Sequence, residues 1–75
     1  MSIEFIPLDG DVWVPHIENE YLLPYIRQNQ GRWGADYDIY IFNYVDRRYE
    51  LVDTAYSLER AKEFVVQKLV ERKLK

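Results

Sequence analysis

The chain is 75 residues long, enough for one small domain, and its 48% hydrophobic and 31% charged residues are typical of a folded protein. It has no cysteine and one histidine, His16, which excludes disulfides, thiolate metal sites and cysteine nucleophiles. The net charge is −3, and the acidic residues are concentrated before residue 60. This negative field disfavours non-specific binding to nucleic acid.

Two membrane-directed signals are missing from the sequence. The first ten residues lack the basic and long apolar stretches of a signal peptide, and no apolar run approaches the roughly 18 residues of a membrane span. We therefore expect a cytoplasmic protein that makes no membrane contact, and we expect residues 1–75 to form a single small α+β domain.

The amino-terminal quarter contains two short candidate strands. Residues 3–6 and 12–14 are rich in apolar side chains, and Pro7 and Pro15 bound them. Trp13 is the expected core anchor of the second strand.

The next segment has two possible structures. Residues 17–26 carry apolar side chains at helical spacing, but Pro24 has no N–H and clashes with the preceding turn of a helix. A short helix and a strand over residues 21–27 both remain open. Residues 28–36 are polar and contain two glycines, which predicts an exposed, mobile loop.

A hairpin is predicted over residues 37–54. Residues 37–45 and 49–54 are rich in Ile, Tyr, Phe and Val, and the intervening Asp-Arg-Arg favours a loop of three to five residues. The register of the two strands is not determined by the sequence.

The carboxy-terminal residues 58–73 predict a helix. Ser57 is a suitable N-cap, and no glycine or proline follows it. The apolar side chains expected to face the core are Leu58, Ala61, Val65 and Leu69, with Phe64 beside them.

A second apolar edge lies beside that helical stripe. It is formed by Val66, Val70 and Leu74. A small domain gains stability by burying such an edge, so these residues predict self-association as a homodimer.

The predicted fold class is therefore α+β. A small antiparallel sheet, made of the hairpin over about 37–54 and one or two amino-terminal strands, is packed by a carboxy-terminal helix over about 58–73.

No constellation in the sequence predicts catalysis or metal binding. The acidic pairs, such as Asp36 and Asp38, are explained as solvated residues at loops and strand ends, and Ser57 is explained as a helix cap. We expect no catalytic residues, no cofactor and no metal ion.

Aromatic content exceeds what a core of this size needs, with seven tyrosines, three phenylalanines and two tryptophans. Strand alternation places Tyr40, Phe42 and Tyr44 on one face of the sheet. The other face carries Tyr37, Ile39, Ile41 and Val45, and we expect the helix to cover it. The first thirty residues could fold over the aromatic face through Trp13, Tyr21 or Tyr25. Alternatively, that face is a binding surface.

The favoured function is a non-enzymatic protein-binding module whose partner is another protein or a second copy of the chain. Tyr, Trp and Arg are enriched at interface hot spots. The candidate partner-binding residues are Arg32, Trp33, Tyr40, Phe42, Tyr44, Arg47, Arg48 and Tyr49. The alternative is a nucleic-acid binder that stacks bases on the sheet aromatics and contacts phosphates through the three arginines.

Overall fold

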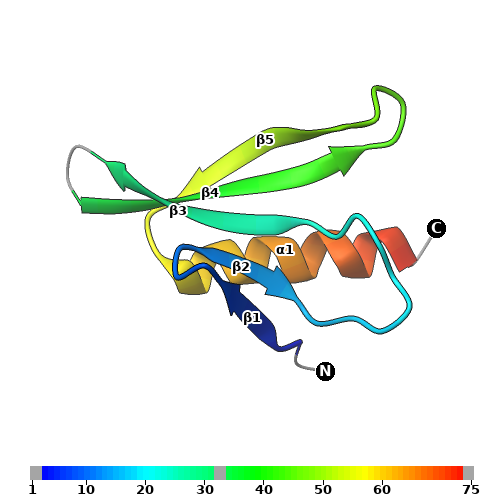
Figure 1. Cartoon of the computed structure of the whole chain (residues 1–75), viewed down its shortest axis with the longest axis horizontal. Coiled ribbons are helices and arrows are strands. Elements are labelled where there is room, and N and C mark those ends of the chain that lie inside the picture. Colours follow the sequence, from blue (N-terminus) through cyan, green and yellow to red (C-terminus); the bar gives the residue numbers. More distant parts are fainter. Residues whose placement is uncertain (1–2, 32–33, 74–75) are drawn as a thin grey trace.

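The computed structural model describes residues 3–31 and 34–73, and in them five strands are followed by one helix (Figure 1). The elements are β1 (Phe5–Leu8), β2 (Val12–Pro15), β3 (Tyr25–Gly31), β4 (Gly34–Asn43), β5 (Arg48–Ala55) and α1 (Leu58–Lys73). The strands form one antiparallel sheet in chain order, from β1 at one edge to β5 at the other. The predicted α+β class is confirmed.

The amino-terminal part contributes more strands than expected. Three strands precede the β4–β5 hairpin, whereas the sequence predicted one or two. The first strand begins at Phe5 rather than at residue 3, and Pro7 lies within it. A proline is tolerated in β1 because it is an edge strand. One side of an edge strand forms no backbone hydrogen bonds within the sheet, so the missing N–H of proline is not needed there.

The short helix considered for residues 17–26 is wrong. Asn19 and Leu22 have φ angles of 62° and 56°, in the left-handed region, which no right-handed helix can contain. Pro24 is followed directly by β3, which begins at Tyr25. The alternative strand therefore starts four residues later than the sequence suggested.

The loop predicted for residues 28–36 is also wrong for residues 28–31 and 34–36, which lie in strands, while residues 32–33 lie outside the described residues. The β3–β4 ladder continues through this segment, with Asn29 opposite Asp36 and Gly31 opposite Gly34. The chain turns so closely here that a Cβ on Gly31 would lie 2.8 Å from the Gly34 carbonyl oxygen and would overlap the Asp36 carboxylate. The polar side chains of this segment do not predict a strand. Its backbone groups can nevertheless form hydrogen bonds with β4, as those of any residue except proline can.

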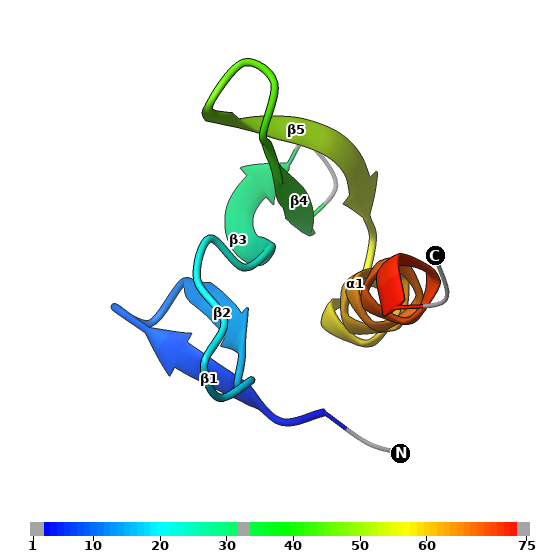
Figure 2. The ribbon, with the colours of Figure 1, turned by 90° about the vertical axis from the view of Figure 1, so that its right-hand side faces the viewer.

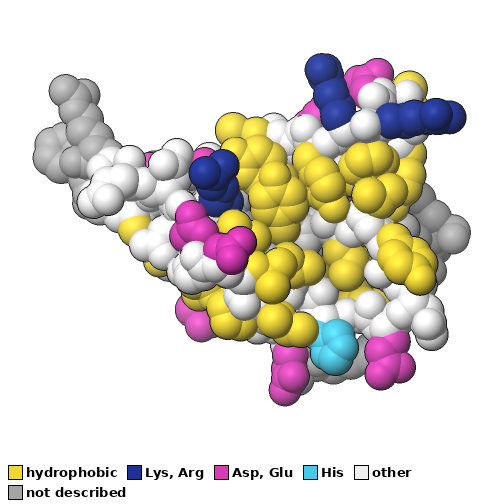
Figure 3. Space-filling model, viewed as in Figure 1, with side chains coloured by type: hydrophobic (Ala, Val, Ile, Leu, Met, Phe, Trp, Pro, Cys, Tyr) yellow, Lys and Arg dark blue, Asp and Glu magenta, His cyan; other side chains and the backbone are white. Residues whose placement is uncertain are grey.

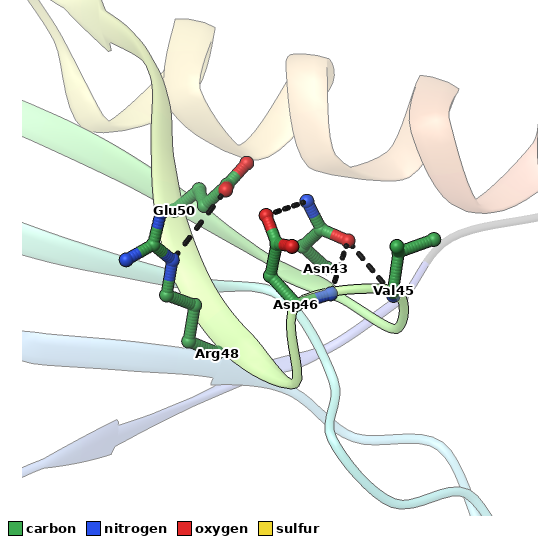
Figure 4. Close-up of polar contacts among 5 residues, drawn as sticks. All are labelled: Asn43, Val45, Asp46, Arg48 and Glu50. Carbon is green, nitrogen blue, oxygen red and sulfur yellow. Dashed lines mark hydrogen bonds and ion pairs between the residues drawn. The ribbon is translucent and has the colours of Figure 1, made fainter.

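The β4–β5 hairpin turns earlier than predicted. Asn43 pairs with Arg48, so Tyr44 and Val45 belong to a four-residue turn rather than to the strand. The Asn43 side-chain oxygen accepts hydrogen bonds from the backbone N–H of Val45 at 2.9 Å and of Asp46 at 3.2 Å (Figure 4). These bonds end the strand, and Val45, expected beneath the helix, is 90% exposed.

Helix α1 begins where the sequence predicted. The Ser57 hydroxyl accepts a hydrogen bond from the Arg60 N–H at 3.2 Å, the arrangement of an N-cap. The helix lies on one side of the strongly curved sheet (Figure 2). The buried cluster between them consists of Ile26, Ile39, Ala61, Val65 and Leu69, with Leu58, Phe64 and Trp13 among the half-buried side chains packed against it.

The amino-terminal segment packs along the flank of the helix. Ile3 and Phe5 contact the core cluster, and the Lys62 ammonium lies 5.7 Å from the centre of the Phe5 ring. Ile3 and Phe5 also line, with Val66, an open groove of about 350 Å³. Val66 is thus half-buried within the chain, while Val70 is 49% exposed. Leu74, the third member of the predicted self-association edge, lies outside the described residues.

Candidate functional site: an aromatic sheet face

The face of the sheet turned away from α1, here called the outer face, is defined by strand register. Tyr25 lies opposite Tyr40, and Phe42 lies opposite Tyr49, so these side chains project from the same face. Ile26 and Ile39, one position along from Tyr25 and Tyr40, pair with each other and point into the core. Pairing of β3 and β5 with β4 thus brings Tyr25 and Tyr49 onto the aromatic face of β4.

Five rings on the outer face form a continuous chain of contacts, here called the aromatic cluster: Tyr40, Tyr25, Tyr49, Phe42 and Tyr44. Tyr25 and Tyr40 stack with ring centres 4.8 Å apart and planes 15° from parallel. Tyr25 meets the edge of Tyr49 at 4.9 Å, and Phe42 meets Tyr49 at 5.2 Å and Tyr44 at 5.1 Å. Both arrangements are favoured by ring electrostatics and hold the rings in defined orientations.

This packing raises the pKa of two of these tyrosines, Tyr25 and Tyr49. Burial raises the pKa of Tyr49, and the neighbouring phenols of Tyr25 and Tyr44 raise it further. Burial also raises the pKa of Tyr25, as does Tyr40, although the Arg27 guanidinium opposes the shift. Each neutral phenol is therefore favoured by its surroundings.

Aliphatic side chains extend the apolar surface on both sides of the aromatic cluster. Across the sheet, Ile6 and Leu8 on β1 are 43% and 48% exposed, and Leu51 on β5 is 54% exposed. Register places all three on the outer face, because Ile6 lies opposite Val14, Leu8 opposite Val12, and Leu51 opposite Tyr40. Hydrophobic side chains cover the centre and right of this face (Figure 3). No second layer formed by residues 3–31 or 34–73 conceals it.

The end of the outer face near the β3–β4 turn is polar. The Asp38 carboxylate accepts a hydrogen bond from the Thr54 hydroxyl at 3.0 Å and another from the Asn29 amide at 3.4 Å. Thr54 reaches this face because β5 has a bulge near Val52, where the register shifts between Ile39 and Tyr40. The apolar surface is therefore bounded by a hydrogen-bonded polar margin.

The arginines expected beside the aromatics do not gather there. Arg48 lies opposite Asn43, on the face opposite Phe42, and its Nε is 3.7 Å from a carboxylate oxygen of Glu50 (Figure 4). Arg47 is exposed in the turn, with a φ of 57°. Arg32 and Trp33 lie outside the described residues. The structure thus brings together Tyr40, Phe42, Tyr44 and Tyr49 but separates Arg48 from them.

Sequence reasoning missed three members of this surface: Tyr25, Arg27 and Leu51. Tyr25 was considered only as a covering residue, yet it lies within the cluster. Arg27 lies next to the cluster on β3 and forms no ion pair with any described residue. Leu51 lies in a run that the sequence predicted as a strand, but its shared face with Tyr25 depends on register.

Polar and titratable side chains elsewhere in the described residues are accessible to solvent. No polar or charged side chain among them is buried, and no three His, Asp or Glu side chains lie together as a metal site would require. A small apolar crevice of about 80 Å³ lies between Leu22, Ile41, Phe42 and Leu69. Within the described part of the chain, no helix is long and apolar enough to cross a membrane.

Comparisons with known proteins find no family model, no curated protein and no solved structure that matches this chain.

Proposed function

We propose that the protein is a non-enzymatic protein-binding module whose interface is the outer face of its sheet. The observation that carries this proposal is the aromatic cluster, five touching rings contributed by β3, β4, β5 and the β4–β5 turn on a face that α1 does not cover. Such a face exposes more contiguous apolar surface than water favours.

The composition of the outer face matches that of a protein interface. Tyrosines dominate its centre, aliphatic side chains surround them, and polar groups such as Asp38 and Thr54 form a margin whose hydrogen bonds are already satisfied. Interface hot spots have the same arrangement: aromatic anchors lose their contact with water on binding, and the polar rim around them remains accessible to solvent. Because contacts within the cluster already restrict Tyr25 and Tyr49, binding costs little further side-chain entropy.

The electrostatics of the same face argue against the nucleic-acid alternative. Asp38 lies on the outer face, and Arg27 is the basic side chain beside the cluster, whereas Arg48 is paired with Glu50 on the opposite side of the strand. Tight binding of nucleic acid requires several phosphates to be neutralised together.

Site-specific photo-crosslinking tests the proposal. A photoreactive amino acid replaces Leu51 on the outer face or, as a control of similar exposure, Val70 on the helix, which are 54% and 49% exposed. We expect protein adducts from position 51 that disappear when Leu8→Asp is added, and few adducts from position 70. Equal yields from both positions, or adducts that persist with Leu8→Asp, would contradict the proposal.

A further inference from the structure

We propose that the partner of the outer face is a second copy of this chain, packed face to face about a two-fold axis. The inference rests on the proposed function and names its partner. It replaces the helical edge of Val66, Val70 and Leu74 as the surface of self-association.

The accessible surface area of the chain is larger than that of a compact monomer of the same mass. Its accessible surface is 5967 Å², whereas a compact monomer of 9.1 kDa exposes about 4,900 Å². Summed over all 75 residues the excess is about 1,000 Å². Each partner in a stable interface buries roughly 800 Å², so the excess is large enough to include one such interface. The radius of gyration, 12.3 Å, also exceeds the roughly 11.4 Å of a compact chain of this length.

Part of the exposed apolar surface lies on the outer face. Among the described residues the hydrophobic core cluster contains five buried side chains, while Ile6, Leu8 and Leu51 are about half exposed on the outer face beside the aromatic cluster. Tyr21, Val45 and Tyr56 are more exposed elsewhere. A second sheet packed at about 10 Å would bury Ile6, Leu8, Leu51 and the rings between them. The polar pair of Asp38 and Thr54 would remain at the edge of that contact.

The charges on this face are compatible with a two-fold contact. Arg27 lines a shallow depression of about 460 Å³ together with Asp9 and Asp11 at the β1–β2 turn, and it has no ion-pair partner among the described residues. A two-fold axis near this depression brings each Arg27 toward Asp9 of the partner subunit. A surface with both signs of charge side by side is self-complementary in this way.

The small core gives a reason for the partner to be a copy. A domain of this size buries only about 60% of the surface its unfolded chain exposes, so it depends on additional burial for stability. A second copy is the one partner that is present whenever the chain itself is present. Dimer formation then stabilises the fold by mass action.

Sedimentation equilibrium with three charge variants tests this arrangement. We expect the parent chain to sediment at twice 9.1 kDa at tens of micromolar. Leu51→Asp on β5 and Val12→Asp on β2 should each raise the dimer dissociation constant by at least about 30-fold, the size of a hot-spot effect. Val12→Asp places its carboxylate opposite Arg27, which favours folding of the variant. Val70→Asp should leave the dimer intact.

Each other pattern of results overturns the inference. Loss of the dimer with Leu51→Asp but not with Val12→Asp indicates edge-to-edge pairing through β5, because β2 is an interior strand. Loss with Val70→Asp alone indicates the helical edge. A parent chain that remains at 9.1 kDa at about 100 μM removes the second copy, while the crosslinking experiment still tests the outer face for another partner.

Hydroxyl-radical footprinting of the parent chain supplies the same test without variants. On going from about 1 to 100 μM, labelling of Tyr40 and Phe42 should fall several-fold. Tyr21 and Tyr56, which are 84% and 87% exposed away from the cluster, should label equally at both concentrations. Equal labelling of Tyr40 across this range would contradict a face-to-face dimer.

Discussion

The Tyr49 hydroxyl on β5 donates a 2.8 Å hydrogen bond to the Leu23 carbonyl, 26 residues earlier in the chain. To make this bond, the Tyr49 ring lies across the outer face of β4, against Phe42, and reaches the segment that leads into β3. The bond is partly buried, and it ties the edge strand to a connection in which Leu22 has a left-handed φ of 56°. Tyr49 thus links the candidate interface to the fold itself.

Removing this hydroxyl should destabilise the protein modestly. Tyr49→Phe keeps the ring contacts but loses the hydrogen bond to Leu23, so the free energy of unfolding should fall by about 1 kcal/mol in urea titration. Amide exchange in residues 16–24 should accelerate. Tyr21→Phe, at an 84% exposed position, is the control and should change neither quantity. A Tyr49→Phe variant as stable as the parent would mean that water replaces the bond at no cost.

Alkaline pH should weaken the fold through Tyr25 and Tyr49. Both have a pKa raised above 10.0, mainly by burial. Because the folded pKa exceeds that of the unfolded chain, the stabilisation is fully present below about pH 10 and is lost as the pH rises through the folded value. Tyr25→Phe cannot ionise, so its free energy of unfolding should fall less than that of the parent above pH 10. Identical curves for Tyr25→Phe and the parent would refute the assignment.

Truncation of the helix core should be costly. Leu69 is 4% exposed within the cluster formed with Ile26 and Ile39, so Leu69→Ala should lower the free energy of unfolding by about 2–5 kcal/mol. Val70→Ala, one position along and 49% exposed, should cost well under 1 kcal/mol in the monomer. Similar melting temperatures for the two variants would show that the wrong helix face has been assigned to the core.

The turn between β4 and β5 offers a stabilising substitution. Arg47 has a φ of 57°, a region in which a side chain is strained and glycine is not. Arg47→Gly should raise the free energy of unfolding by about 0.5 kcal/mol. Arg48→Gly removes the same charge from a strand position and should lower stability by about 1 kcal/mol. If both variants change stability in the same direction, charge rather than backbone conformation controls the turn.

Binding to nucleic acid should be undetectable under physiological salt. In about 150 mM salt, fluorescence anisotropy with mixed-sequence single-stranded oligonucleotides should show no submicromolar binding, because Arg48 and the aromatic cluster lie on opposite faces. Binding abolished by combining Arg47→Ala with Arg48→Ala, with a log–log salt slope near −0.7 per phosphate, would instead favour the alternative function.

Local pattern was sufficient for the carboxy-terminal helix and for part of the aromatic face. The apolar spacing of Ala61, Val65 and Leu69 identified the residues that the structure buries, and Ser57 marked the start of α1. Strand alternation placed Tyr40 and Phe42 on one face of the sheet and Ile39 on the other, as observed. These features depend on periodicities of 3.6 and 2 residues within one segment, so no distant residue is needed to predict them.

The third strand could not be predicted in the same way, whereas β1 and β2 lie near the strands expected at residues 3–6 and 12–14. In residues 25–31 only the first two side chains are large and apolar, and the ladder with β4 forms through backbone groups that all residues share. Apolar spacing in residues 17–26 suggested a helix, but the left-handed conformations of Asn19 and Leu22 turn the chain toward β3 instead.

The sequence by itself thus determined the fold class, the core side of the helix and one row of aromatic side chains, because each of these is a property of a single segment. Only the tertiary structure decided that Tyr25 and Tyr49 join that row while Arg48 turns away from it. Strand side chains alternate with a period of two, so a shift of one residue in register, or one bulge residue such as Val52, exchanges the two faces. Register is set by hydrogen bonds between neighbouring strands, and those of the β3–β4 and β4–β5 hairpins assemble the outer face.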